Sequence, residues 1–432
     1  MRNILLCSLF VLLVSITGGA KPVHHYVYFG MDREKLKDAT TFLEMKNFEG
    51  AQIAYSWRQL EPGKDEYDFS LIREDLAFLS SKGKKLFVQI QDVSFSEKGI
   101  HVPRYLVRDP QYGGGADKQY TYKFVDDRET DVKVLGWMAR RWDEKVRERF
   151  KNLLVELGKE FDGKIEGVNL AETAFDIGRS GALFPKDFTY EKYRDGVIAN
   201  MKAMREAFPK SVVLVYANFL PGDGNLRAVY DAARKLRVGV GGPDLLPYKE
   251  WQMKSSYPLI RASSDQVAVG VAVQDGNYAH VNPRTGKQVT IDEIIKFGKE
   301  YLGVDYIFWC TEEPYYSEQL VPFLKEGSKS HENTLPPPGH PRRDSPGFTT
   351  HSISNDARAG SKTLLHILIQ QQRVGIFWNG RYRVFACAVG IRFLGRSKTW
   401  NAAFVGLCRV QFGSRSFPGA PAVPALPRTH AR

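Results

Sequence analysis

The run Lys164-Ile-Glu-Gly-Val-Asn-Leu-Ala-Glu172 joins a short apolar stretch to a carboxylate that follows it directly. Such a run predicts a buried strand that ends at Glu172. A helical pattern ends near Phe161, and Gly163 is suited to the left-handed residue that closes a helix. In a barrel of alternating strands and helices, the chemistry gathers at the carboxyl ends of the strands. The run therefore predicts a barrel strand, with Glu172 as a candidate catalytic acid.

The same alternation continues from about residue 24 to residue 326. Further apolar runs predict strands at 26–29, 50–55, 85–91, 211–216, 238–241, 266–273 and 304–309. Helical patterns lie within 32–46 and at 71–81, with Ser70 as N-cap, and at 190–208, 226–236, 291–301 and 317–325. Strands that are apolar throughout are typical of a parallel sheet buried on both faces. Eight strands with helices between most of them predict an α/β fold, a (β/α)8 TIM barrel.

An open doubly wound sheet is the alternative, and 238–241 is the weakest of the eight strands. That fold would be favoured by a glycine-rich phosphate turn after the first strand. Gly30-Met-Asp32 is not such a turn.

Residues 1–20 are expected to be a signal peptide. Arg2 gives a positive start, Ile4 to Ile16 is apolar, and Gly18-Gly-Ala20 offers small residues for cleavage. The apolar run is shorter than the roughly 20 residues that span a bilayer. A buried first strand is the alternative. We expect a secreted or periplasmic protein, not held at a membrane once the signal is removed.

The net charge of +12 belongs to the end of the chain. Residues 327–432 carry 15 basic and three acidic side chains, whereas the remainder carries 46 of each. This segment opens with Leu335-Pro-Pro-Pro-Gly-His-Pro-Arg-Arg343 and is expected to be a basic, non-globular C-terminal tail, disordered or translated out of frame; an accessory module is the alternative. The neutral remainder gives no sign of a nucleic-acid partner.

Cysteine and histidine spacing predicts neither zinc nor another metal, and no cofactor is implied. Cys310 is expected to be a buried free thiol. A monomer is expected.

Polar and aromatic side chains gather where the predicted strands end. They are Tyr55, Trp57, Arg58, Gln89, Gln91, Asp92, Asn169, Glu172, Tyr216, Asn218, Asp244, Gln274, Asp275, Trp309, Glu312, Glu313 and Tyr315. Carboxylates, amides and aromatic rings at one rim suit a sugar, because rings stack on its apolar faces and two carboxylates share acid–base work.

Three segments resemble the opening of clan-A glycoside hydrolases: Trp57-Arg-Gln-Leu-Glu-Pro62, Tyr67-Asp-Phe-Ser70 and Gly83-Lys-Lys-Leu-Phe-Val-Gln89. The resemblance covers residues 24–326 and is strongest in 50–92. It implies that Glu172 is the acid/base and that Trp309 is an aromatic sugar platform. It also implies a nucleophilic Glu at the end of strand seven. The substrate-binding residues expected with it are Tyr55, Trp57, Arg58, Gln89, Asn169, Tyr216, Asn218 and Trp309.

Two departures concern the carboxylates. In the clan an Asn directly precedes the acid, whereas here Asn169 stands three residues before Glu172. Strand seven ends in Gln274-Asp275, with no Glu. Asp275, Glu312 or Glu313 is therefore the expected second carboxylate.

Each candidate also has a structural interpretation. Glu172 could be a surface carboxylate, and Asp275 is favoured as a turn former before Gly276. Glu312 and Glu313 could be charges at a helix start. Trp309 could be core, and Trp57 with Arg58 a packed pair. Arg140, Arg141 and Arg149 are expected on a solvated helix face.

Three functions remain open: a glycoside hydrolase acting on an oligo- or polysaccharide, a carbohydrate-binding barrel that has lost its nucleophile, and a barrel enzyme of another class, such as a deacetylase or lyase.

Overall fold

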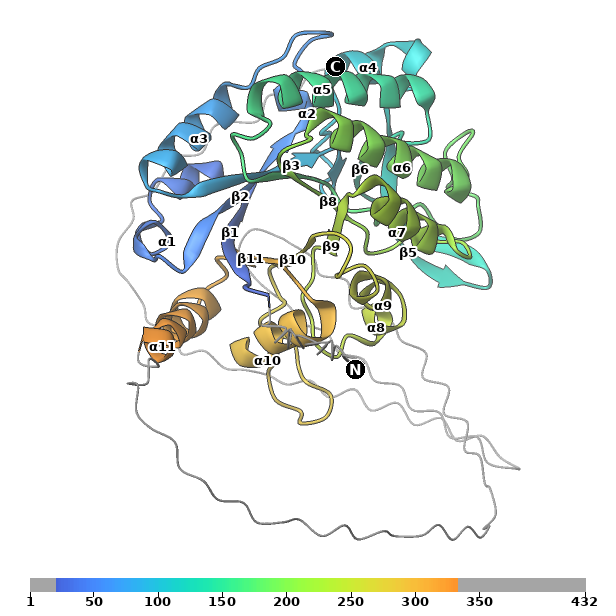
Figure 1. The fold of residues 1–432 in the computed structure, drawn as a ribbon. Coiled ribbons are helices and arrows are strands. Elements are labelled where there is room, and N and C mark those ends of the chain that lie inside the picture. Colours follow the sequence, from blue (N-terminus) through green and yellow to red (C-terminus); the bar gives the residue numbers. More distant parts are fainter. Residues whose placement is uncertain (1–20, 333–432) are drawn as a thin grey trace, which may run out of the picture. The chain divides into compact units, whose positions relative to one another are not determined.

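Eight parallel strands close into a barrel in the computed structural model, which describes residues 21–332 and the side chains of 21–326 (Figure 1). The strands are β1 (His24–Gly30), β2 (Phe48–Ser56), β3 (Lys85–Gln91), β7 (Gly167–Leu170), β8 (Val212–Tyr216), β9 (Gly239–Gly242), β10 (Val269–Val273) and β11 (Tyr306–Cys310). Each pairs with the next, and β11 pairs with β1. The predicted TIM barrel is confirmed. The expected signal peptide and basic tail lie outside the described residues.

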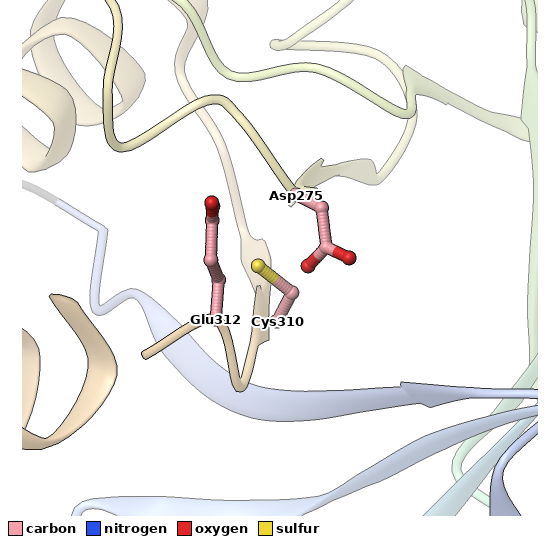
Figure 2. A group of neighbouring side chains, drawn as sticks. All are labelled: Asp275, Cys310 and Glu312. Atoms are coloured by element: carbon pink, nitrogen blue, oxygen red, sulfur yellow. The ribbon is translucent and has the colours of Figure 1, made fainter. Parts of the chain in front are cut away.

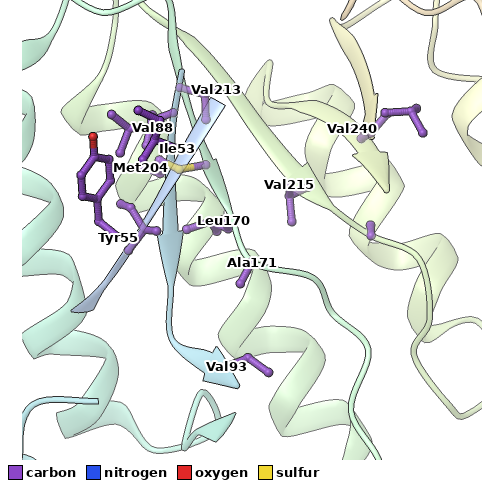
Figure 3. Close-up of a cluster of buried hydrophobic side chains, with 14 of the residues drawn as sticks. Ile53, Tyr55, Val88, Val93, Leu170, Ala171, Met204, Val213, Val215 and Val240 are labelled. Atoms are coloured by element: carbon purple, nitrogen blue, oxygen red, sulfur yellow. The ribbon is translucent and has the colours of Figure 1, made fainter. Parts of the chain in front are cut away.

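Alternate side chains of the strands form two separate apolar clusters. One fills the barrel and consists of Tyr26, Phe87, Leu214, Tyr216, Ala272, Tyr306 and Phe308. The other lies between the strands and the surrounding helices, and Figure 3 shows Ile53, Val88, Leu170 and Val213 in it with Met204 of α6 (Tyr190–Ala207). The buried strands are apolar on both faces because each face packs against one of these clusters.

The glycine-rich sequence of β9 has a steric cause. A Cβ placed on Gly241 would lie 1.6 Å from the carbonyl oxygen of Gly270 on β10. Only glycine allows this approach, which explains why the strand carries the weakest apolar signal of the eight.

Helices follow the strands around the barrel. The main ones are α3 (Ser70–Ser81), α5 (Glu144–Phe161), α6, α7 (Asn225–Leu236), α10 (Ile291–Lys296) with a π-helix at Phe297–Leu302, and α11 (Val321–Glu332) after a π-helix at Tyr316–Leu320. The shorter ones are α1 (Thr40–Glu44) after a 3-10 turn at Arg33–Leu36, α2 (Trp57–Leu60), α4 (Arg104–Arg108) before a 3-10 turn at Pro110–Tyr112, α8 (Glu250–Lys254) and α9 (Ser256–Arg261). No helix between residues 21 and 332 is long and apolar enough to cross a membrane.

Two local expectations differ from the structure. The helix expected within 32–46 is a 3-10 turn and a five-residue helix. The N-cap expected at Ser70 is wrong, because α3 begins with Ser70, whose backbone N–H donates to Oδ1 of Asp68 at 2.9 Å.

A hairpin interrupts the alternation after β3. Its strands are β5 (Ala116–Val125) and β6 (Arg128–Ala139), and the short β4 (Val93–Ser94) pairs with β6. Asp126 and Asp127 form its turn with positive φ angles of 49° and 56°. This hairpin was not predicted.

The arginines expected on a solvated helix face are buried. Arg140 and Arg141 precede α5, and Arg149 lies on its inner side, with 7, 4 and 7% of their surface exposed. Arg141 forms a two-pronged pair with Asp92, with Nε–Oδ2 at 2.8 Å and Nη2–Oδ1 at 2.5 Å. That expectation was wrong, because buried acidic partners were not recognised.

Candidate active site

The backbone around Glu172 is fixed at the carboxyl end of the barrel. The N–H of Ala171 donates to the carbonyl of Ile90 at 3.2 Å, and that of Thr173 donates to the carbonyl of Tyr216 at 2.9 Å. Arg141 donates from Nη1 to the Glu172 carbonyl at 3.0 Å. The residue after β7 is thus tied to β3, to β8 and to a buried arginine.

The Glu172 side chain is half-buried, and Oε2 accepts a 2.7 Å hydrogen bond from Nδ2 of Asn218. The pKa of Glu172 is raised to about 7; burial is the largest cause, and the negative charge of Asp244 adds to the increase. Asn218 and Arg141 act in the opposite direction. A carboxyl group with this pKa carries a proton in much of the population at neutral pH, as a general acid must.

Amides and a phenol form a buried polar layer inside the barrel. Gln52 donates from Nε2 to Oδ1 of Asn169 at 3.0 Å and to the hydroxyl of Tyr216 at 3.1 Å. All three side chains are at most 2% exposed. Asn169 and Tyr216 were expected to contact substrate, but in the structure both bind Gln52. Gln52 was not singled out from the sequence.

Tyr28 joins this layer to the rim and was also missed. Its hydroxyl donates to Oε1 of Gln89 at 3.4 Å, and Gln91 donates to the same oxygen at 2.8 Å. Burial raises the pKa of Tyr28, and the charges of Glu172 and Asp275 raise it further. Tyr28 therefore lies within electrostatic reach of both carboxylates. The alternation of Tyr26 and Tyr28 in the sequence was the available signal.

Asp244 is the acidic residue whose charge raises the pKa of Glu172. From the sequence it was noted only as a polar residue near strand six. Its Oδ1 accepts hydrogen bonds from Gln274 Nε2 at 2.8 Å and Asn277 Nδ2 at 2.9 Å. Its Oδ2 accepts one from Gln252 Nε2 at 3.0 Å. Three amides thus fix a carboxylate that is 12% exposed.

Gln274 marks where this carboxylate lies. Positions 270 and 272 of β10 face the barrel interior, because a Cβ on Gly270 would meet Leu214 and Phe308, and Ala272 packs in the inner cluster. Gln274 is the next member of this inward series. The loop after β9 therefore carries a carboxylate to the end of β10.

Asp275, Cys310 and Glu312 form a second group (Figure 2). One potential ligand atom from each lies within 4.8 Å of the others, so the group could hold a cation. Burial raises the pKa of the Cys310 thiol, which is also hydrogen-bonded to Asp275. Glu312 accepts the Gly276 N–H at 2.7 Å. The three side chains thus have protein partners of their own.

Glu313 lies just before the π-helix at Tyr316–Leu320 and accepts hydrogen bonds from it. Its Oε2 accepts the backbone N–H of Ser317 at 3.2 Å and the Ser317 hydroxyl at 2.5 Å. The structural interpretation, a charge at a helix start, is confirmed for Glu313.

The structure removes three aromatic residues from the expected sugar site. Tyr55 donates its hydroxyl to Asp75 of α3 at 2.8 Å. The indole of Trp57 donates to Glu61 at 2.7 Å, and that of Trp309 donates to Nδ1 of His25 at 3.0 Å. All three are at most 1% exposed and belong to the outer cluster. On β2 and β11 the alternation turns Tyr55 and Trp309 away from the barrel interior, so the predicted platform was wrong.

Arg58 lies in another neighbourhood. Its Nε donates to the carbonyl of Val102 at 2.8 Å. Burial lowers the pKa of Arg58, and the charges of Arg104 and Arg108 lower it further. Its neighbours are thus cationic, and it is not among the groups that act on Glu172.

Comparison with known proteins gives matches among solved structures alone. No family model matches the chain, and no curated protein does. A family 39 glycoside hydrolase from Bacteroides cellulosilyticus WH2 is 13% identical, covers 67% of this chain and 56% of its own, and has a TM-score of 0.40. The exo-beta-1,4-mannosidase Op5Man5 from Opitutaceae bacterium strain TAV5 is 12% identical, covers 73% of this chain and 61% of its own, and has a TM-score of 0.43. Endo-glycoceramidase II from Rhodococcus sp. is 13% identical, covers 70% of this chain and 78% of its own, and has a TM-score of 0.42. The chain spans less than two thirds of the first two proteins.

Proposed function

We propose that this protein is a glycoside hydrolase in which Glu172 is the general acid and Asp244 the second carboxylate. The observation that carries the proposal is that Asp244, fixed at the end of β10 by Gln274, is the acidic side chain that acts on Glu172. Two carboxyl groups at the carboxyl end of a barrel, one protonated and one ionised, are the requirement for cleaving a glycosidic bond.

The chemistry divides between the two groups. The Glu172 carboxyl group gives its proton to the glycosidic oxygen, which leaves with the electron pair of its bond to the anomeric carbon. Asp244 then bonds to that carbon, and water breaks this ester bond after giving a proton to the Glu172 carboxylate; in the other case Asp244 takes a proton from the water that attacks the carbon directly. Retention of the anomeric configuration assigns the nucleophile role to Asp244, and inversion assigns the base role. The substrate expected is an oligo- or polysaccharide, with Asn218 beside the acid.

Leaving-group chemistry tests the roles in the full-length protein. An aryl glycoside with a dinitrophenolate leaving group needs no proton, whereas an alkyl glycoside does. Glu172→Gln should keep much of the wild-type kcat/KM on the dinitrophenyl glycoside. On the alkyl glycoside its kcat/KM should fall by about 10²- to 10⁴-fold. Asp244→Asn should lose activity on both. Asp275→Asn and Glu312→Gln are the matched controls, and a loss confined to either of them would transfer the second role to that residue.

A non-catalytic carbohydrate-binding barrel is the second candidate. It is favoured by Gln274, an amide at the inward position that directly follows β10. Saturable sugar binding with no turnover on any glycoside would support it. The group of Asp275, Cys310 and Glu312 favours a metal-dependent enzyme of another class, for which turnover should require added divalent cation and fall in Glu312→Gln.

We also propose export of the protein, from the charged and apolar pattern of residues 1–20. N-terminal sequencing of the protein recovered from the periplasm or medium should begin near Lys21. An N-terminus at Met1 would contradict export by cleavage.

A further inference from the structure

Trp251 exposes more of its surface than any other large hydrophobic side chain described between residues 21 and 326. It lies on α8, and 58% of it is exposed. Its ring lies 5.7 Å from that of the half-buried Phe219, with the planes 47° apart. Exposure of apolar ring surface to water is unfavourable, so a ligand that covers the exposed tryptophan lowers the free energy.

Both rings are attached to the residues that hold the two carboxylates. Phe219 directly follows Asn218, which donates to Glu172 at 2.7 Å. Trp251 directly precedes Gln252, which donates to Asp244 at 3.0 Å. The aromatic pair therefore lies in the connections that follow β8 and β9, and each of its residues adjoins in sequence an amide that binds one of the two carboxyl groups.

The backbone of each aromatic residue is fixed. The carbonyl of Phe219 accepts the hydroxyl of Thr173 at 2.8 Å, and the carbonyl of Trp251 accepts that of Ser255 at 2.9 Å. Thr173 is the neighbour of Glu172, so one hydrogen bond links the acid's loop to the ring's loop. A backbone that is already ordered adds little entropic cost when its side chain binds a ligand.

We propose that Phe219 and Trp251 form the sugar-stacking platform of this site and bind a pyranose ring whose hydroxyls are mostly equatorial. Such a ring has an apolar C–H face, which stacks on an aromatic face, and a polar edge for the adjacent amides. The platform expected at Trp309 is thus supplied from the loops after β8 and β9. This inference rests on the proposed function, because it places a sugar beside Glu172 and Asp244.

Binding of cellohexaose, mannohexaose and xylohexaose by the full-length Glu172→Gln protein tests the platform without turnover. In that background Trp251→Ala should weaken binding of the preferred hexasaccharide by about tenfold or more, Phe219→Ala should weaken it less, and Trp251→Phe should restore part of it. Phe124→Ala is the control, because Phe124 is 38% exposed on the β5–β6 hairpin. Circular dichroism checks that each variant is folded.

A tryptophan fluorescence change on sugar binding should accompany these affinities and disappear in Trp251→Ala. Equal dissociation constants for Trp251→Ala and Phe124→Ala, or no saturable binding of any of the three sugars, would overturn the platform. Hydrolysis of aryl glycosides by the wild-type protein alongside such a result would leave the proposed function standing. Platform binding without hydrolysis would instead overturn the proposed function.

Discussion

The side chain of Asn218 donates a 2.7 Å hydrogen bond to Oε2 of Glu172 and joins the end of β8 to the carboxyl group that follows β7. A hydrogen bond to the ionised form of an acid favours that form. Asn218 therefore limits how far burial raises the pKa of Glu172, which lies at about 7.

Asn218→Ala should raise the pKa of Glu172 above this value. Since the general acid must be protonated, the rate falls as pH rises through its pKa, and the alkaline limb of kcat/KM should move to higher pH. The maximal rate should fall because the acid loses its orientation. Asn282→Ala, which removes an amide that donates to Glu293 at 2.9 Å, should leave the profile in place. A shift to lower pH would contradict this assignment.

Asp244→Asn should act in the opposite direction on the same pKa. The negative charge of Asp244 disfavours ionisation of Glu172, so its removal lowers the pKa of Glu172. Titration of ¹³C-labelled glutamate by NMR measures this without any turnover. Asp275→Asn should leave the titration of Glu172 unchanged, because Asp275 is not among the groups that shift it. An equal shift in both variants would rule out a specific pairing with Asp244.

Glu172→Gln should make the folded protein more stable than the wild type at pH 8 and nearly equal to it at pH 5. The folded-state pKa of about 7 lies above the ordinary value of 4.5, so the stability of the native state falls as pH rises between these two values. Each pKa unit corresponds to about 1.4 kcal/mol. Urea unfolding at both pH values measures the difference. A stability gain that is independent of pH would show that burial does not raise the pKa of Glu172.

The strands could be predicted from the sequence. Which of their side chains face the barrel interior and which face the helices was not predicted. β3 was predicted with both bounds correct, because an apolar run between a helix and a turn leaves little choice. Tyr55 and Trp309 were assigned to the site by their nearness to strand ends. The inward neighbours Gln52 and Phe308 show that the period of two turns them outward.

Other parts of the site depend on contacts that are distant in sequence. Asp92 and Arg141 are 49 positions apart, and the intervening hairpin separates them along the chain. Asp244 and Gln274 come from different strand ends. Glu172 could be proposed from the sequence because it follows an apolar run, although β7 itself ends two residues earlier, at Leu170. The carboxylate that acts on it could not be chosen among several rim acids without the fold.

Asp92→Asn should destabilise the protein by about 3–5 kcal/mol, because it leaves the Arg141 guanidinium charged and buried. Asp131→Asn provides the comparison. Its pair with Lys123 is exposed, with 60 and 73% of the two side chains accessible, and should contribute little to the free energy of unfolding. Chemical denaturation measures both. An equal loss of unfolding free energy in the two variants would show that the buried ion pair contributes no more to stability than the exposed one.

Tyr55→Phe should lower stability and leave sugar affinity unchanged. The variant removes the 2.8 Å hydrogen bond to the buried Asp75, at a cost of about 1–3 kcal/mol. Denaturation and hexasaccharide binding, measured on the same protein, separate the two effects. A weaker dissociation constant at unchanged stability would return Tyr55 to the sugar site.

Hydrolysis of a panel of alkyl and aryl glycosides by the full-length wild type, beside Glu172→Gln and Asp244→Asn, tests the paired carboxyl groups directly. We expect hydrolysis by the wild type, loss of alkyl glycoside cleavage in Glu172→Gln with dinitrophenyl glycoside cleavage retained, and loss of both in Asp244→Asn. Full activity in either variant, or no hydrolysis by a correctly folded wild type, would contradict the pairing of Glu172 with Asp244 as a glycosidase site.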